Sequence, residues 1–239
     1  MGFRRKTNSS NEHCEEPARE LCAGAITRVT QQKRDPERVS VFINDEYAFG
    51  LTLDLAAREG LKKGMPLSTE AQQALLDDEK GHRARAVALN YVGNQARTLE
   101  EVRRKLREKS YGADITDEAI QRLTDYGYLD DEAYAKAYVE SRFSGSGHGP
   151  RRLRVDLIKR GVDRAIVERV VSEAFEDDEL REAALQQGRK RWAALEHETD
   201  LRKRKKKVID FLVRRGFDYG LAHQILDTLV EETDTEQAD

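Results

Sequence analysis

Lysine and arginine side chains gather in three clusters, and these clusters are the part of the sequence best suited to binding chemistry. Guanidinium and ammonium groups bind phosphate oxygens and acidic protein surfaces. We therefore expect an anion-binding surface built from these residues: Arg103, Arg104 and Arg107 in the first cluster; Arg151, Arg152, Arg154, Lys159 and Arg160 in the second; and Arg202, Lys203, Lys205, Lys206, Arg214 and Arg215 in the third.

The alternative for each cluster is an ordinary solvated helix face. This alternative stays open for the first cluster, because Glu100, Glu101 and Glu108 lie beside its bases. In the third cluster, residues 202–207 are all basic and would point in every direction around a helix. At least half of them must face away from any core, which favours an outward role in anion binding.

Other reactive side chains are scattered and form no catalytic pattern. The sequence has no phosphate-binding glycine loop, no nucleophile elbow and no His/Cys/Asp cluster of catalytic spacing. Asp130 and Asp131 could be a metal-binding pair, but the position of Asp131 before a helix favours an N-cap. His148 is isolated, and the loop 144–149 could place an anion on the next helix or be a plain linker. We expect no enzyme activity, no metal and no cofactor.

The composition of the 239 residues favours small helical modules in a row over one thick core. Charged residues make up 36% of the chain and hydrophobic residues 38%. The net charge of −3, from 42 basic and 45 acidic residues, argues against a protein that merely coats nucleic acid. The sequence shows no signal peptide, no apolar run that spans a bilayer and no disulfide framework, so we expect a cytoplasmic protein that does not bind membranes.

The N-terminal part alternates apolar and polar residues as strands do. Turn residues at 33–38 and 44–46 separate three such segments, which predicts a three-stranded meander over about 24–51. A short helix over 53–59 follows, ended by Gly60. From Thr69 onward the pattern is helical, with a helix near 83–94 and a capping box formed by Thr98 and Glu101.

One phrase recurs in the helical part, where a basic helix end meets a glycine. Its copies cover 157–163 and 212–218, with a looser copy over 106–112. In each copy we expect the glycine to take the left-handed conformation that ends a helix: Gly112, Gly161 and Gly216. The glycines are about 50 residues apart, a period that indicates a stacked array of three-helix units.

The predicted fold is therefore mainly α: tandem three-helix repeats that form an elongated curved body, preceded by the β meander. In the second unit we place Tyr134, Ala137 and Tyr138 on the inner face, where packing is the favoured role for the tyrosines over stacking on bases, and Pro150 at a first helical position. The expected segments are a disordered leader (1–22), the meander with its short helix (23–68), three helical units (69–127, 128–175 and 176–231) and an acidic tail (232–239).

Several motifs carry a resemblance to a known family. The stretch 127–135, Gly-Tyr-Leu-Asp-Asp-Glu-Ala-Tyr-Ala, is followed by Gly-Pro-Arg-Arg-Leu at 149–153 and Lys-Arg-Gly-Val at 159–162. Upstream, residues 96–106 read Ala-Arg-Thr-Leu-Glu-Glu-Val-Arg-Arg-Lys-Leu, with Val102 in a place that is usually Leu. These phrases resemble the RecX regulatory proteins of bacteria over about residues 84–230. The resemblance is strong over 96–163 and weak in the third unit.

The resemblance implies tandem three-helix units and a regulator without enzyme activity. It implies binding to the filament that the RecA recombinase forms on single-stranded DNA, with inhibition of ATP hydrolysis and strand exchange and with effects on recombination, DNA repair and the SOS response. We expect a monomer and leave binding of double-stranded DNA open. The alternative is a DNA-binding transcriptional regulator built from helix-turn-helix-like units. Two observations count against it: the sequence shows no dimerisation element, and its helices carry mostly Arg, Lys and Glu, which we expect to contact phosphates and not bases here.

Overall fold

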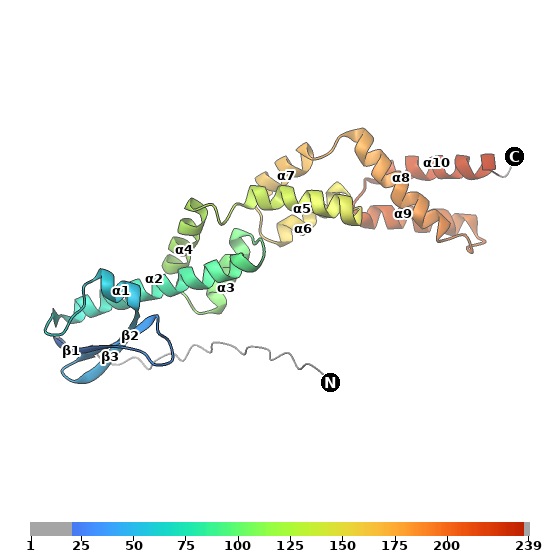
Figure 1. Ribbon diagram of the computed structural model, residues 1–239. Helices are drawn as coiled ribbons and strands as arrows, with labels where there is room; N and C mark the ends of the chain where they lie inside the picture. Colours follow the sequence, from blue (N-terminus) through green and yellow to red (C-terminus); the bar gives the residue numbers. More distant parts are fainter. Residues whose placement is uncertain (1–20, 237–239) are drawn as a thin grey trace, which may run out of the picture. The chain divides into compact units, whose positions relative to one another are not determined.

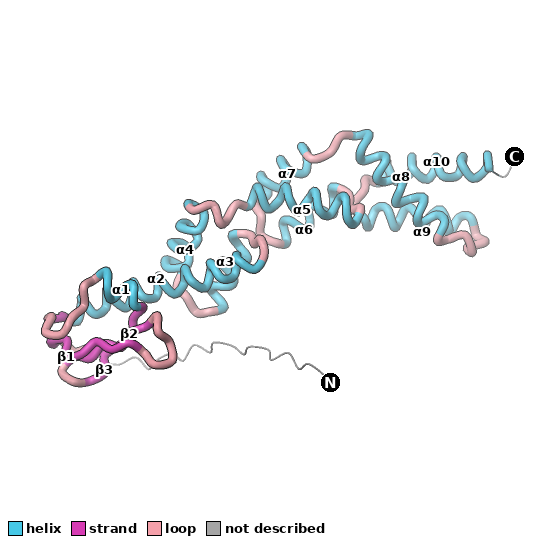
Figure 2. Tube along the Cα trace, in the orientation of Figure 1, coloured by secondary structure: helices cyan, strands magenta, loops and turns pink. Residues whose placement is uncertain are grey.

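The structure is a computed structural model that describes residues 21–236, with the side chains of residues 21–233. The expected leader (1–22) and acidic tail (232–239) lie largely outside the described residues. The chain divides into two compact units, one that ends at Lys80 and one that begins at Gly81. Figures 1 and 2 show the sheet in the first unit and the helices of the second.

The N-terminal unit is built on an antiparallel sheet with the strand order β3-β2-β1-β4. The strands are β1 (Gly24–Gln31), β2 (Arg38–Ile43), β3 (Glu46–Thr52) and β4 (Pro66–Leu67). Asn44 and Asp45 join β2 to β3 with φ angles of 52° and 68°, the left-handed pair that a tight hairpin turn needs. The expected meander is correct for β1–β3, but the prediction of three strands misses β4, whose two residues are too few to show an alternating pattern.

Two helical segments cover one face of this sheet. Leu55 from α1 (Leu53–Arg58) and Leu75 from the first part of α2 (Thr69–Asn94) are buried in the same core as Val41 and Leu51. Glu79 fastens α2 at the sheet, since its buried carboxylate pairs with Arg38 at 2.7 Å and accepts a hydrogen bond from the Thr52 backbone N–H. The helix expected near 83–94 is the second half of α2, which continues through 26 residues.

The second unit contains three helical bundles, each with its own apolar core. The first bundle combines the second half of α2 with α3 (Leu99–Glu108) and α4 (Ala113–Asp125). The second combines α5 (Asp131–Ser146), α6 (Pro150–Lys159) and α7 (Arg164–Glu173), and the third combines α8 (Asp177–Ala193), α9 (Leu201–Arg215) and α10 (Tyr219–Glu236). The prediction of tandem three-helix repeats is confirmed (Figure 1).

The apolar stripes of the middle helices supply the centres of these cores. Val102 and Leu106 of α3, Leu153 and Leu157 of α6, and Val208 and Leu212 of α9 are all fully buried. Each pair is four residues apart and so lies on one helix face. The bases of the same helices occupy the remaining faces. In α5 the buried apolar residues are Ala135 and Val139, whereas Ala137, predicted on the inner face, is exposed.

Several helix boundaries are as the sequence indicates. Thr98 and Glu101 form the expected capping box, and Pro150 occupies the first turn of α6. Gly161 and Gly216 end helices with φ angles of 85° and 97°. In the first copy of the repeated phrase, however, the left-handed residue is the exposed Ser110, with a φ of 62°.

Three local assignments were wrong by a few residues. Gly112 has a φ of −63° and is the N-cap of α4, and is not a helix stop. The N-cap of α5 is Asp130, whose carboxylate accepts from the backbone N–H groups of Glu132 and Ala133. The helix α5 also continues through Ser146, so the linker that we expected over 144–149 begins only at Gly147.

Candidate anion-binding surface of the helical unit

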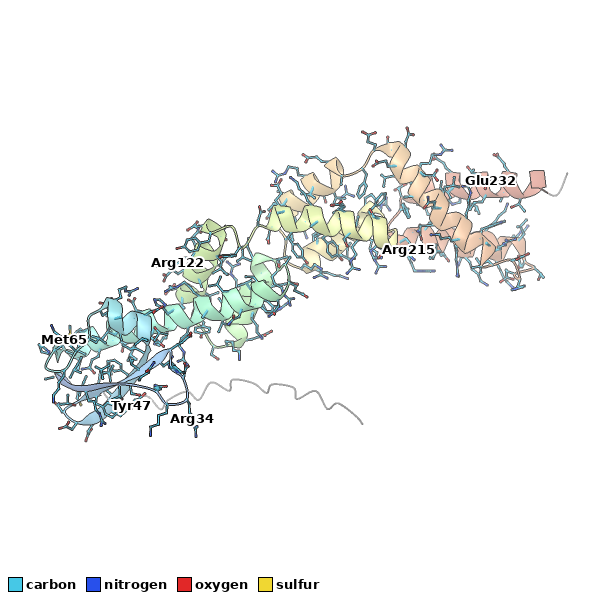
Figure 3. The ribbon with its side chains drawn as sticks, viewed as in Figure 1. Arg34, Tyr47, Met65, Arg122, Arg215 and Glu232 are labelled. Carbon is cyan, nitrogen blue, oxygen red and sulfur yellow. The ribbon has the colours of Figure 1, made fainter. Side chains whose placement is uncertain are left out.

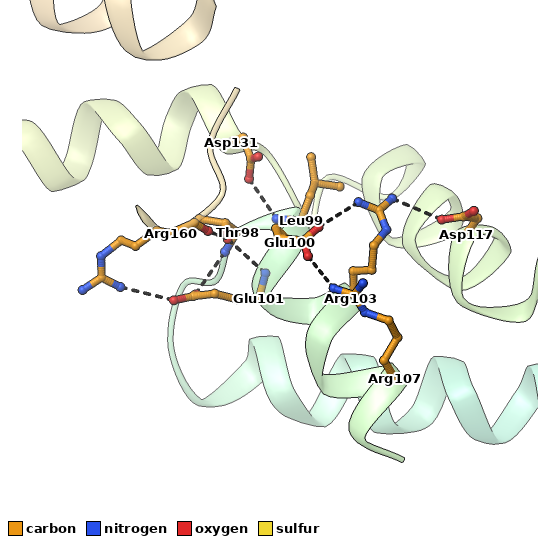
Figure 4. Close-up of polar contacts among 9 residues, drawn as sticks. All are labelled: Thr98, Leu99, Glu100, Glu101, Arg103, Arg107, Asp117, Asp131 and Arg160. Atoms are coloured by element: carbon orange, nitrogen blue, oxygen red, sulfur yellow. Dashed lines mark hydrogen bonds and ion pairs between the residues drawn. The ribbon is translucent and has the colours of Figure 1, made fainter. Parts of the chain in front are cut away.

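In the first basic cluster, on α3, two of the three arginines are neutralised by neighbouring carboxylates. Arg103 pairs with Glu100 at 3.2 Å and with Asp117 at 3.1 Å, and Arg107 pairs with Glu100 at 2.5 Å (Figure 4). Arg104 is exposed and has no ion pair with any described residue. Arg103 and Arg107 therefore fit the alternative of a solvated helix face, and Arg104 is the arginine of this cluster without an ion pair among the described residues.

In the second cluster, on α6, most of the arginines also have acidic partners. Arg151 pairs with Asp218 at the start of α10, and Arg154 pairs with Glu168 of α7 at 2.8 Å. Arg152 has looser contacts, 3.6 Å to Asp156 and 3.4 Å to the Arg214 carbonyl. Lys159 is exposed and has no ion pair within the described part of the chain.

Arg160 has a structural position at the junction between the first and second bundles (Figure 4). Its carbonyl accepts a hydrogen bond from the Thr98 hydroxyl at 2.6 Å, and its guanidinium contacts Glu101 at 3.2 Å and the Tyr134 hydroxyl at 3.1 Å. The guanidinium also lies over the Tyr138 ring, 5.0 Å from its centroid. These contacts give both tyrosines a packing role.

A buried carboxylate completes this first junction. Asp131 is 6% exposed and accepts a hydrogen bond from the Leu99 backbone N–H at 2.9 Å (Figure 4). Burial raises the pKa of Asp131, and the hydrogen bond from Leu99 acts in the opposite direction. Asp131 thus ties the first turn of α5 to the first turn of α3.

The third cluster, on α9, divides between paired and exposed bases. Lys203, Lys206 and Lys207 pair with Asp200, Asp210 and Glu198 at 3.6, 3.7 and 2.5 Å. Arg204 lies over Trp192, 3.9 Å from the ring centroid, and donates to the Trp192 carbonyl. Among the described residues, no ion-pair partner lies beside the exposed Arg202 and Arg214 or the half-buried Lys205.

The junction between the second and third bundles is made of backbone contacts. The Gly149 N–H donates to the Arg215 carbonyl at 2.8 Å, and the Arg151 N–H donates to the Gly216 carbonyl at 3.0 Å. A Cβ at Gly216 would lie only 2.4 Å from the Arg152 backbone nitrogen, so this contact needs glycine. The repeated Arg-Gly phrase therefore joins one bundle to the next at both 160–161 and 215–216.

Beside this second junction, basic side chains that are far apart in the sequence lie close together. Arg152, Arg215 and Lys190 line an open hollow of about 620 Å³ together with His148. Arg215, labelled in Figure 3, also donates to the Ser146 carbonyl. Burial lowers the pKa of His148, and Arg152 and Arg215 lower it further. The sequence does not indicate Lys190 or His148 as part of a site, because neither lies within a basic run.

Matches to known protein families divide the chain in the same order as the structure does: an N-terminal domain and then three helical bundles. Four family models match in succession: the regulatory protein RecX N-terminal domain at 24–68, then the first, second and third RecX three-helix domains at 84–123, 130–171 and 177–226. The chain belongs to the RecX family. The family assignment therefore includes the N-terminal unit, which lies outside the region of about 84–230 where the motifs carry the resemblance.

Relatives agree with this assignment. A Regulatory protein RecX of Clostridium acetobutylicum is 29% identical over 212 residues, which cover 87% of this chain and 97% of the relative. One of Lactobacillus delbrueckii subsp. bulgaricus is 32% identical over 219 residues, covering 89% and 77%. A crystal structure of regulatory protein RecX has the same fold, with a TM-score of 0.70 at 24% identity, covering 86% of this chain and all of that one. The structure of RecX from Lactobacillus salivarius gives a TM-score of 0.57 at 29% identity, covering 66% and 99%.

Two further structural features bear on metal binding and on membranes. Within residues 21–236, no group of three or more His, Cys, Asp and Glu side chains is placed to hold a metal ion. None of the helices in the same range is long and apolar enough to cross a bilayer.

Proposed function

We propose that this RecX family member is a negative regulator of the RecA recombinase that binds the RecA filament on single-stranded DNA. In this proposal it inhibits ATP hydrolysis and strand exchange, and so modulates recombination and the SOS response. The observation that carries the proposal is that the middle helix of each bundle bears exposed cations without an acidic partner among the described residues. These cations are Arg104 on α3, Lys159 on α6, and Arg202 and Arg214 on α9.

The charge of the whole chain supports a filament as the partner over bare DNA. The net charge is −3, and most bases of the three clusters are already paired with carboxylates. A few free cations give a weak and salt-sensitive attraction to phosphates alone. A protein–DNA filament offers protein contacts in addition, so the few cations need only contribute part of the binding energy.

The free cations also argue against a sequence-specific transcriptional regulator. They are arginines and lysines separated along three helices, and no Asn, Gln, Ser or Thr stands beside them on α3, α6 or α9. Such a pattern suits phosphate contacts, whose strength does not depend on the base sequence.

The test is RecA ATP hydrolysis on single-stranded DNA, titrated with this protein at fixed RecA and near-physiological salt. We expect inhibition at protein concentrations too low to coat the DNA. Inhibition that appears only when the DNA is saturated would indicate a plain DNA binder, and no inhibition at any concentration would contradict the proposal.

A charge-neutralised variant links the effect to the proposed surface. The triple variant Arg104→Gln, Lys159→Gln and Arg214→Gln should require on the order of tenfold more protein for the same inhibition. The matched control is Arg122→Gln, Lys136→Gln and Arg189→Gln, which removes three cations that are paired with Glu118, Glu132 and Glu232. Equal loss in both variants would show that only total charge matters.

A further inference from the structure

The hollow beside the second junction is lined by cations from several separate elements. Arg152 comes from α6, Lys190 from α8 and Arg215 from the end of α9, and His148 lies in the loop between α5 and α6. The other lining residues are Gly145, Ser146 and Gln187, so none of the residues that line it is acidic. Its volume of about 620 Å³ is in the range that holds a small-molecule-sized group.

The hydrogen-bonding capacity of these groups is only partly used. Arg215 gives one N–H to the Ser146 carbonyl, and Arg152 has only the long contacts to Asp156 and Arg214. A guanidinium has five N–H donors, so both retain several. The Lys190 ammonium is exposed and has no ion pair with any described residue, and the buried Nδ1 of His148 has no hydrogen-bond partner there.

The shape of the donor set favours a phosphate over a carboxylate. The donors that line the hollow come from three helices and a loop. A tetrahedral phosphate accepts hydrogen bonds in several directions, whereas a carboxylate accepts in one plane. The backbone here is fixed as well, because the glycine contacts of the second junction and the packing of Gln187 against Gly147 hold the walls together.

We propose that this hollow, with Arg152, Lys190, Arg215 and His148, binds a backbone phosphate of a single-stranded DNA strand. The inference rests on the proposed function for the identity of the strand, and it adds a defined phosphate site to the diffuse basic surface. The groups that face His148 are Arg142 of α5, Arg152 and Asp156 of α6, Lys190 of α8 and Arg215 of α9. A bound phosphate adds negative charge to this mainly cationic set, and so favours the protonated imidazole.

Lys190 is the residue to change, because no hydrogen bond or ion pair within the described part of the chain uses its side chain. The experiment measures binding of a fluorescent oligothymidylate to the full chain over a range of salt concentrations. Lys190→Ala should weaken binding on the order of fivefold and reduce the slope of log K against log salt by about 0.7, the value for one contact on a single strand. The matched control is Arg181→Ala, an exposed cation on the same helix that does not line the hollow, and it should leave both quantities unchanged.

A second readout reports the site itself. In an NMR titration the pKa of His148 should rise when the oligothymidylate binds, and this rise should be reduced in Lys190→Ala. Inorganic phosphate is the comparison probe: if it shifts the His148 resonances and the oligonucleotide does not, the ligand is free phosphate and the proposal is wrong. Unchanged affinity and salt slope in Lys190→Ala, or equal losses in both variants, would also overturn it.

The outcomes separate this inference from the proposed function. Normal DNA binding by Lys190→Ala together with RecA inhibition by the unmodified protein would remove the phosphate site and leave the regulatory role. DNA binding that depends on Lys190, without any RecA inhibition by the unmodified protein, would leave the phosphate site and remove the regulatory role.

Discussion

The two junctions between neighbouring bundles share one backbone arrangement and differ in charge. In both, the C-terminal end of a middle helix meets the N-terminal end of the middle helix before it: α6 meets α3, and α9 meets α6. At the first junction the Arg160 carbonyl accepts from the Thr98 hydroxyl. At the second the Arg215 and Gly216 carbonyls accept from the backbone N–H groups of Gly149 and Arg151. The arrangement sets carbonyl ends against amide ends, which is favourable for the helix dipoles.

The side chains around the two junctions have opposite character. At the first, Glu101 and Asp131 accept from Arg160 and from the Leu99 N–H, so its donors are satisfied inside the protein. At the second, Arg151 pairs with Asp218, but among the described residues Asp156 is the only acidic partner, and a loose one, of the group formed by Arg152, Lys190 and Arg215. At the first junction the charged side chains therefore help to hold two bundles together. At the second junction they leave cationic groups available for a ligand.

The largest expected effect comes from the close backbone contact of the second junction. Gly216→Ala should lower the free energy of unfolding by about 3 kcal/mol, because the new Cβ meets the Arg152 nitrogen and the backbone has a φ of 97°. Gly127→Ala is the matched control, with a φ of 75° and open space at its Cβ, and should cost only about 1 kcal/mol. Urea unfolding measures both, and equal losses would show that the contact contributes nothing.

A smaller effect is expected from the cap that forms the first junction. Thr98→Ala removes both the capping hydrogen bond to the Glu101 N–H and the bond to the Arg160 carbonyl, which should cost about 1–2 kcal/mol of unfolding free energy. Thr98→Ser keeps the hydroxyl and should remain close to the unmodified protein. If Thr98→Ser is as destabilising as Thr98→Ala, the packing of the Thr98 methyl group, and not the two hydrogen bonds, stabilises this end of α3.

The smallest effect concerns Asp131 and has a defined pH dependence. Because the folded-state pKa of Asp131 is raised, the native state holds this proton more tightly than the unfolded chain does. Its contribution to stability is therefore greatest at pH values below the ordinary aspartate pKa and is lost as the pH rises through the folded-state pKa. Asp131→Asn keeps an acceptor for the Leu99 N–H and should remove this pH dependence.

The measurement is urea unfolding at pH 3.5 and pH 7. At neutral pH the Asn variant should be at least as stable as the unmodified protein, by up to about 1 kcal/mol. A variant that is clearly less stable at pH 7 would show that the ionised carboxylate, through Arg160 or the start of α3, stabilises the first junction.

The sequence predicted helix ends best, because glycine at a helix stop and a Thr/Glu capping box each have a specific role in the backbone. Gly161 and Gly216 were recognisable as helix stops, and Thr98 with Glu101 as a capping box, because these local patterns need no tertiary partner. The looser copy over 106–112 misled, since Ser110 is exposed and takes the left-handed conformation without the close contact that requires glycine. The contacts that join each bundle to the next could not be predicted from periodicity alone.

The candidate site was less accessible to sequence reasoning. Runs of bases show where cations are dense, but they do not show that Arg103, Arg151 and Arg154 have carboxylates from other helices beside them. They also give no weight to Lys190 or His148, which reach the hollow from an ordinary polar helix and a loop. Long-range pairing decides which charges remain free, and the pattern along one chain does not contain it.

The central claim is that the partner is the recombinase filament, with DNA as one component of the surface. The most direct measurement compares the affinity of this protein for preformed RecA filaments on single-stranded DNA with its affinity for the same DNA without RecA. Both are measured at about 150 mM salt, where attraction between exposed charges more than about 8 Å apart is largely screened. We predict clearly tighter binding to the filament, with binding to bare DNA lost first as salt is raised. Equal affinity for the two, or tighter binding to the bare strand, would contradict the account.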